Sequence, residues 1–453
     1  MPKQLDLNSL SASELIALVK EVGGQRPFER KYGIPRTTLQ ARLKKARDEQ
    51  WNHRPVLKPI EERVDQGVRR FILTSAQDRT VVHEGFLAQL EAYCAWLNED
   101  APCDIMIAGF TYNKSLFEDH AKRSGLFHHS LTKYLVFDHI NINGVVDFCA
   151  ELNTRPTASN PLNGCENFTE DRWGIFPHAK LQIKSVPTHK QKQPKILLST
   201  GCVTRTNYVP LRAGIKAELE HSLSAVLVET DHIGKFFCRH LIAEEDGSFY
   251  DLDRRISNGV VTTGHNLKSI TWGDLHVKQI DPEVCAASFG IMPTNRRANG
   301  HRVWVENIPG SVIDTMRPEY QQFEDVSDFY ARNHHNIKNA LAPDQSHTID
   351  DIENGMHGHE GVNGSRGSIA GYRRTGIKAT FGHAHSCAVL GDVWQSGTKS
   401  KLDLGYNGGM SSWSHSDVWQ YQNGHRVMIT FHGNAWNIPV EKAGLQKSSS
   451  DIK

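Results

Sequence analysis

The sequence predicts a mixed α/β (α+β) protein with a small all-α domain at its N-terminus. Three observations support this prediction. The first fifty residues contain three short helical patterns, an apolar helix pattern at 86–100 precedes a buried strand pattern at 103–110, and strands and turns dominate from Ile196 onward. A chain of 453 residues exceeds one ordinary core, so we expect two or three domains.

The N-terminal helices have clear boundary signals. Ser11 is followed by Glu14 three residues later, which is a capping box at the start of the first helix. Gly33 closes the second helix, and Leu39 and Leu43 form the inward face of the third at i, i+4 spacing. Two short helices, a glycine-containing turn and a basic third helix predict a helix-turn-helix domain over residues 1–54.

The face of the third helix opposite the leucines carries four candidate DNA-binding residues, Arg36, Thr37, Gln40 and Lys44. The segment from Met1 to Arg54 holds 11 Lys/Arg against 6 Asp/Glu, which makes it basic. It resembles the Psq/transposase-type helix-turn-helix, and the resemblance implies DNA as a partner. The alternative is a small helical bundle whose basic face is simply solvated.

Composition limits the class of protein. The formal net charge is only +1, so the whole chain has no electrostatic preference for nucleic acid or membrane. The 8 Cys contain no C-x-x-C pair, which favours reduced thiols in a cytosol-like compartment. No apolar run is long enough to cross a membrane, and the start lacks a signal peptide. We therefore expect no membrane span.

The expected domain order continues after the helix-turn-helix. Residues 55–80 are expected to be a linker, and residues 81–265 a middle α/β region that packs on the catalytic domain or forms part of it. Residues 266–440 are expected to be the catalytic domain, and residues 441–453 a disordered tail. Six histidines have no partner pattern and are expected to be ordinary hydrogen-bonding residues: His120, His128, His129, His139, His232 and His240.

Oxygen and imidazole ligands gather at four places in the C-terminal half, mostly where a strand pattern ends. The residues are Asp274 and His276; Asp325, Asn333 and His334; His357; and His383 and His385. Because strand ends of an open α/β sheet are where ligands collect, these side chains are expected to converge. The ligand set suits two divalent metal ions, with Mn²⁺ preferred and Zn²⁺, Fe or Mg²⁺ as alternatives.

In chain order, these clusters resemble the calcineurin-like metallophosphoesterase family. Asp274-Leu275-His276 matches its opening Asp-x-His, and Gly382-His383-Ala384-His385 matches its closing Gly-His-x-His. The stretches NPLNGCENFTEDRWGIFPHAK, GMHGHEGVNGSRGS and KLDLGYNGGMSSW also resemble the DNA-transfer (first-step-transfer) proteins of tailed phages, a likeness that runs from about Val81 to Arg426. The resemblance implies a C-terminal layered α/β sandwich with metallophosphoesterase activity.

The resemblance also implies roles for these residues. Asp274, His276 and His385 would hold one metal, Asp325 would bridge the two, and His357 and His383 would hold the second. A water activated by two metals would attack phosphorus, and a histidine of the Asn-His block, here His334, would protonate the leaving oxygen. Asp274, Asp325 and His334 are therefore the expected catalytic residues.

The Asn-His block departs from the family pattern. Only seven residues separate Asp325 from Asn333, whereas a parallel crossover needs about a dozen or more. Either Asn333, His334 or His335 completes the second metal site, or that metal is weakly held and activity is reduced or lost. Asp328 and Asp314 are alternatives to Asp325, and His359 stands where related phage proteins tend to have Asp.

The resemblance implies a phage metal-dependent phosphodiesterase that acts on DNA in the cytoplasm of the infected bacterium, in DNA transfer or host DNA degradation. A non-catalytic DNA-binding protein with a degenerate phosphoesterase scaffold is the first alternative, and a phosphoesterase of small nucleotides is the second. Whether the chain forms a homo-oligomer stays open.

Overall fold

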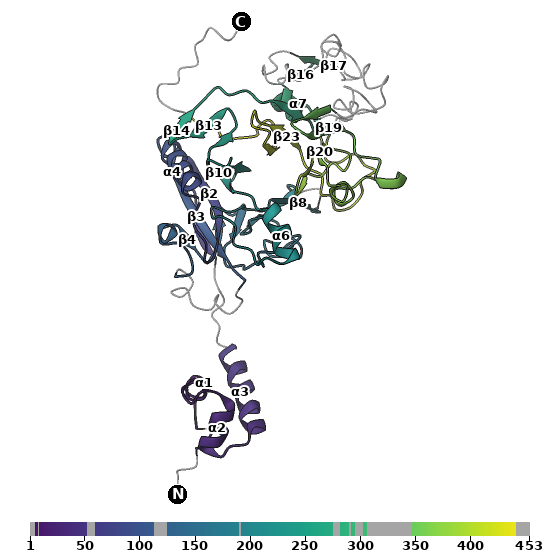
Figure 1. Ribbon diagram of the computed structural model, residues 1–453. Coiled ribbons are helices and arrows are strands. Elements are labelled where there is room, and N and C mark those ends of the chain that lie inside the picture. Colours follow the sequence, from purple (N-terminus) through teal and green to yellow (C-terminus); the bar gives the residue numbers. More distant parts are fainter. Residues whose placement is uncertain are drawn as a thin grey trace. The chain divides into compact units, whose positions relative to one another are not determined.

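The chain folds into two compact units, Met1–Lys58 and Pro59–Lys453 (Figure 1). The computed structural model describes residues 5–7, 9–51, 59–112, 125–189, 192–274, 281–289, 291–294, 302–305 and 347–440. Among the described helices, none is long and apolar enough to cross a membrane.

The N-terminal unit consists of α1 (Ala12–Glu21), α2 (Gln25–Tyr32) and α3 (Arg36–Trp51). The predicted capping box forms, because Ser11 accepts a bond from the backbone of Glu14 while the Glu14 carboxylate accepts one from the backbone of Ser11. Gly33 ends α2 in the left-handed conformation at φ 68°. The core contains Leu15 and Phe28 packed against the predicted inward residues of α3. Local sequence signals therefore account for this unit.

The second unit contains a five-stranded sheet covered by one long helix. The sheet order is β11-β10-β2-β3-β4. The strands are β2 (Val68–Gln77), β3 (Cys103–Phe110), β4 (Leu135–Val136), β10 (Ser224–Asp231) and β11 (Phe236–Ile242). The helix α4 (Glu84–Asn98) connects the parallel strands β2 and β3, as a βαβ unit requires.

An eleven-stranded mixed sheet faces the first. Its order is β1-β5-β6-β7-β9-β8-β21-β22-β20-β19-β18. The bounds, in that order, are Ile60–Glu62, His139–Ile142, Val146–Cys149, Trp173–Phe176, Lys195–Ser199, Gln182–Val186, Ala388–Leu390, Val393–Gln395, Lys378–Phe381, Ile352–Met356 and His347–Ile349. The strand β8 pairs with β21, so the expected middle region and the expected catalytic domain share one continuous sheet.

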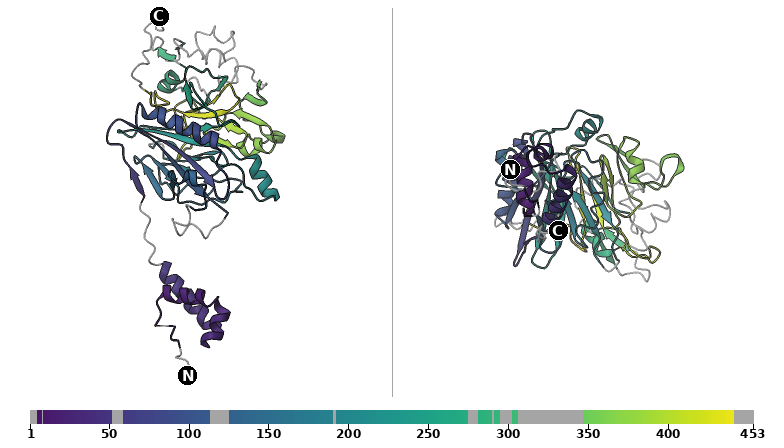
Figure 2. Two further views of the ribbon diagram at one scale, coloured as in Figure 1. Left: turned by 60° about the vertical axis from the view of Figure 1, so that its left-hand side comes forward. Right: turned by 90° about the horizontal axis from the view of Figure 1, so that it is seen from below.

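Apolar side chains fill both interfaces of this layered arrangement. Phe71 and Val226 of the five-stranded sheet pack against Phe148 and Leu198 of the eleven-stranded sheet. On the other face of the five-stranded sheet, Phe86 and its neighbours on α4 complete a second core. Figure 2 shows the blue helix α4 lying along the sheets. The expectation of a mixed α/β fold is confirmed.

Smaller elements complete the unit. A meander is formed by β12 (Phe249–Asp251), β13 (Arg254–Ser257) and β14 (Val260–Thr262); a three-stranded sheet by β15 (Ser269–Thr271), β23 (Ser416–Gln420) and β24 (Arg426–Thr430); and a pair by β16 (Ile291–Thr294) and β17 (Arg302–Val305). The remaining helices are α6 (Arg212–Leu219), α7 (Pro282–Phe289) and α10 (Ile369–Arg373), with 3-10 turns η2 (His129–Leu131) and η6 (Val362–Gly364).

The segment 55–80 differs from the expected linker. Its described part contains β1 and the buried strand β2. The adjacent Arg69 and Arg70 argued against a buried strand at this position, because a buried charge is costly unless it has an opposite charge beside it. Arg70 is fully buried and bonds Asp100 at 2.7 Å and Glu229 at 3.2 Å, and Glu229 in turn bonds Arg239 at 2.5 Å. These carboxylates lie far along the chain, so local composition could not reveal the pairing.

Candidate metal centre

Asp274 is the buried centre of the candidate site. It lies just beyond β15, where its backbone bridges Thr398: Asp274 N donates to Gly397 O at 2.9 Å, and Lys399 N donates to Asp274 O at 2.8 Å. Gly273 permits this approach, because a Cβ there would lie 2.8 Å from both Ser416 O and Thr398 N. The backbone therefore fixes the direction of a carboxylate that has no solvent exposure.

The loop after β20 brings two histidines to this carboxylate. The backbone N–H of His383 donates to Asp274 Oδ2 at 2.8 Å, and His385 Nε2 lies 3.4 Å from the same oxygen. Both histidines have positive φ, 74° and 57°, which is uncommon for residues other than glycine. Backbone strain of this kind persists where surrounding contacts enforce it, and the Trp413 ring packs 4.3 Å from the His385 ring.

The loop after β19 supplies a third histidine. His357 Nε2 lies 3.3 Å from Asp274 Oδ2, and its ring packs edge-on against that of His383 at 4.9 Å. His357 Nδ1 also lies 3.1 Å from His359 Nδ1. Because β19 and β20 are parallel, the loops that follow them meet at one edge of the sheet. The strand-end rule therefore explains why His357 and His383 come together.

Gly358 separates the two histidines of the first loop for a steric reason. It has φ +91°, and a Cβ at this position would lie 2.3 Å from the Phe381 ring. The ring belongs to the last residue of β20, so the glycine lets the histidine loop pack directly on the neighbouring strand. A side chain here would push His357 away from Asp274.

The electrostatics favour a neutral imidazole at His383. Burial lowers the pKa of His383 to about 4, and the nearby His357, Arg366 and His359 act in the same direction. A neutral imidazole offers a lone pair, which is the form that binds a metal. The imidazoles of His357 and His385 lie next to one oxygen of Asp274, and the His383 ring packs against that of His357. This set of oxygen and nitrogen ligands fits a divalent cation of borderline softness. Asp274, His357, His383 and His385 would hold it.

The other predicted ligands and catalytic residues lie outside the described residues. These are His276, Asp325, Asn333 and His334, together with the alternatives Asp314, Asp328 and His335. Their roles, including the bridging carboxylate and the proton donor, stay predictions. The described residues thus contain the part of the predicted centre built by Asp274 and by the two histidine loops.

The candidate DNA-binding face belongs to the N-terminal unit. Arg36, Thr37, Gln40 and Lys44 are all exposed on α3, while Leu39 and Leu43 are buried. Gln40 Nε2 donates to Gln25 of α2 at 3.2 Å, which ties the face to the preceding helix. The four side chains are therefore open to solvent, and their role in DNA binding stays a prediction.

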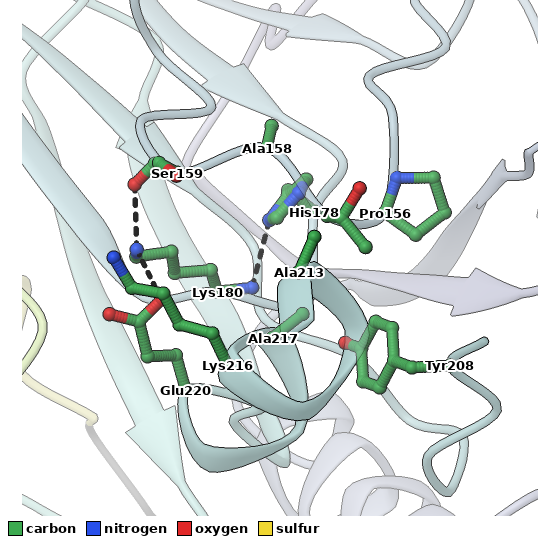
Figure 3. Close-up of a pocket in the computed structure, with 11 residues that line it drawn as sticks. Pro156, Ala158, Ser159, His178, Lys180, Tyr208, Ala213, Lys216, Ala217 and Glu220 are labelled. Carbon is green, nitrogen blue, oxygen red and sulfur yellow. Dashed lines mark hydrogen bonds and ion pairs between the residues drawn. The ribbon is translucent and has the colours of Figure 1, made fainter. Parts of the chain in front are cut away.

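Figure 3 shows a pocket that sequence reasoning missed, between the loop 156–159 and α6. Its volume of about 40 Å³ is enough for a water molecule or two and far too small for a nucleotide. Lys180 Nζ in its wall is bonded to Ser159 O and to Glu220, both at 2.6 Å. The charge of Lys180 is therefore balanced by Glu220 within the fold.

Comparison with known proteins gives one relationship. The chain is 30% identical to "Protein A1" of Escherichia phage T5 over 483 aligned positions, which cover 81% of this chain and 82% of the phage T5 protein. No model of a protein family matches the chain. No solved structure matches it either.

Proposed function

The chain belongs to the family of Protein A1 of Escherichia phage T5, and from this premise we propose that it is a divalent-metal-dependent phosphodiesterase that cleaves DNA. We place its action early in phage infection, in the cytoplasm of the infected bacterium, during DNA transfer or host DNA degradation. The observation that carries the proposal is the convergence of His357, His383 and His385 on the buried carboxylate of Asp274.

The residues of the site have separable tasks. The His383 N–H holds Asp274 Oδ2 in one orientation, and burial keeps the His383 imidazole neutral. When bound, divalent cations supply charge neutralisation on the phosphoryl oxygens and a water nucleophile at neutral pH. Arg366 is exposed and close enough for its charge to lower the pKa of His383, so it can attract a phosphodiester to the site.

DNA is favoured over a small nucleotide by the exposed basic face of α3. Arg36 and Lys44 can contact phosphates while Thr37 and Gln40 reach base edges. A nuclease with a separate DNA-binding unit gains affinity for long substrates without any change at the metal centre. A small-nucleotide phosphoesterase would have no need of such a face.

The test is cleavage of supercoiled plasmid DNA with Mn²⁺, with and without EDTA. We expect nicking that EDTA abolishes, that His385→Ala removes, and that the exposed His189→Ala leaves unchanged. DNA binding without metal-dependent cleavage, together with a His385→Ala variant indistinguishable from wild type, would instead establish the alternative of a non-catalytic DNA-binding protein. Cleavage of a small phosphodiester but not of plasmid would favour the small-nucleotide alternative.

A further inference from the structure

A second set of metal-binding side chains lies on the hairpin of β5 and β6. His139 pairs directly across the hairpin with Cys149, and Glu151 follows two residues later. One ligand atom from each of these three residues lies within 4.8 Å of the other two. This is a mixed nitrogen, sulfur and oxygen set, unlike the oxygen and nitrogen set around Asp274.

The distances within the set approach those of a tetrahedral ion site. His139 Nδ1 lies 2.9 Å from Glu151 Oε1. Zinc bonds of about 2.0–2.3 Å place tetrahedral ligand atoms roughly 3.3–3.8 Å apart. The separation of His139 and Glu151 lies just below that range, and the ligand atom of Cys149 is within 4.8 Å of both, so small side-chain rotations would bring the three atoms around an ion.

The opposite edge of the His139 ring faces a buried carboxylate. His139 Nε2 lies 3.4 Å from Asp147 Oδ1, and Asp147 is held by Asn141 at 2.7 Å and Arg172 at 2.8 Å. Metal-binding histidines commonly direct their second ring nitrogen to a carboxylate, which orients the ring and raises its basicity. Asp147 occupies that supporting position.

The thiol of this set lies in an apolar cluster. Cys149 is fully buried and packs with Leu162, Cys165 and Phe176 on the face of the sheet opposite the main core. Within the described part of the chain, Glu151 Oε2 is also buried and accepts no hydrogen bond. A thiolate and one carboxylate together carry two negative charges, which a divalent cation neutralises, while Asp147 stays paired with Arg172.

We propose that His139, Cys149 and Glu151 supply three ligands of one zinc ion, with a water in the fourth position, at a site separate from the phosphoesterase centre. The thiolate excludes Mg²⁺ and Ca²⁺, which require oxygen ligands, and disfavours Mn²⁺. The ion joins β5 to the end of β6 and so fixes the start of the long connection that leads to β7. The proposal is independent of the proposed nuclease function.

Cobalt substitution tests the site on the full-length protein, because a cysteine thiolate gives Co²⁺ a near-ultraviolet charge-transfer band. The described ligands of the phosphoesterase centre include no cysteine, so the band reports Cys149. We expect the band in wild type and in Cys165→Ser, a matched change in the same cluster, and its loss in Cys149→Ser. Added Zn²⁺ should displace Co²⁺ and raise the melting temperature.

A wild type without the band, or a band that survives Cys149→Ser, would overturn the proposal. Should Cys149→Ser fail to fold, His139→Gln and Asp147→Asn give the same answer by zinc titration. Loss of the supporting carboxylate should weaken zinc binding by about 10–100-fold. Unchanged zinc affinity in both variants would show that His139 is merely ion-paired with its two carboxylates.

Discussion

The backbone N–H of His383 donates a 2.8 Å hydrogen bond to Oδ2 of Asp274, which lies 109 residues earlier in the chain. The bond joins the loop after β20 to the end of β15, two elements of different sheets. His357 and His385 contact the same oxygen. One carboxylate therefore organises both histidine loops, and removal of its negative charge tests the site directly.

Replacement of Asp274 with Asn should abolish metal binding while the fold survives. The amide keeps the size of the side chain and an oxygen for the His383 N–H, but it removes the negative charge. Mutation of a residue that only supports a metal ligand already costs about 10–100-fold in metal affinity or activity. For the ligand Asp274 itself we therefore expect DNA cleavage to fall by at least about 100-fold. Metal content and plasmid nicking measure the effect. Exposed Asp253→Asn is the control, and full metal content in Asp274→Asn would contradict the assignment.

Gly358→Ala should destabilise the protein and disturb His357. The new Cβ would lie 2.3 Å from the Phe381 ring, in a backbone conformation of φ +91°. Strain and overpacking together should cost about 2–5 kcal/mol in the free energy of unfolding. Gly376→Ala is a matched control, because Gly376 has φ +75° and open space around it.

Urea unfolding and metal titration distinguish the two glycine variants. Gly376→Ala should show only the strain cost of about 1–2 kcal/mol and bind metal normally. Gly358→Ala should lose more stability and also bind metal more weakly. Equal losses in the two variants would mean that the contact with Phe381 does not position the histidine loop.

The N-terminal unit could be predicted nearly residue by residue because its signals are local. The capping box of Ser11 and Glu14, the closing Gly33 and the i, i+4 leucines each act within one or two helical turns. The structure reproduces all of them. No long-range pairing was needed for this part of the prediction.

The sheet order could not be predicted in the same way. The pairing of β8 with β21 brings together residues about two hundred positions apart, and neither strand carries a signal for its partner. The burial of Arg70 depends on Glu229 of β10, so the sequence around residues 55–80 resembled a linker. Local periodicity indicates that a strand exists, whereas its neighbours are decided by tertiary packing.

The site was predictable to the extent that strand ends converge. Histidines placed after two strand patterns led to the expectation that His357, His383 and His385 would lie near Asp274, and the parallel strands β19 and β20 carry their loops to one edge of the sheet. The cluster of His139, Cys149 and Glu151 was not predicted, because Cys149 and Glu151 lie across a hairpin from His139. The Asn143-Gly144 pair was the available signal, since a turn there sets His139 opposite Cys149.

Removal of Arg36 and Lys44 should reduce the salt dependence of DNA binding. Each phosphate contact contributes about 0.9 to the magnitude of the slope of log K against log salt concentration. The double variant to Ala should therefore reduce that magnitude by about 2. Exposed Lys20→Ala on α1 is the control, because it removes a charge from a different helix. An unchanged slope in the double variant would show that the basic face of α3 is only solvated.

Stability should fall on mild acidification, in part because of His240. Burial lowers the pKa of His240 to about 4, and its Nε2 donates to Ser199 O at 2.7 Å. The unfolded chain, with a pKa of about 6.5, binds the proton first, so stability is full above about pH 6.5 and declines as pH falls toward 4. The slope is about 1.4 kcal/mol per pH unit.

Between pH 7 and pH 5, His240→Gln should therefore lose about 2 kcal/mol less free energy of unfolding than wild type, as measured by urea unfolding at each pH. The exposed His189→Gln should keep the full wild-type loss, and an identical loss in His240→Gln would refute the role of His240.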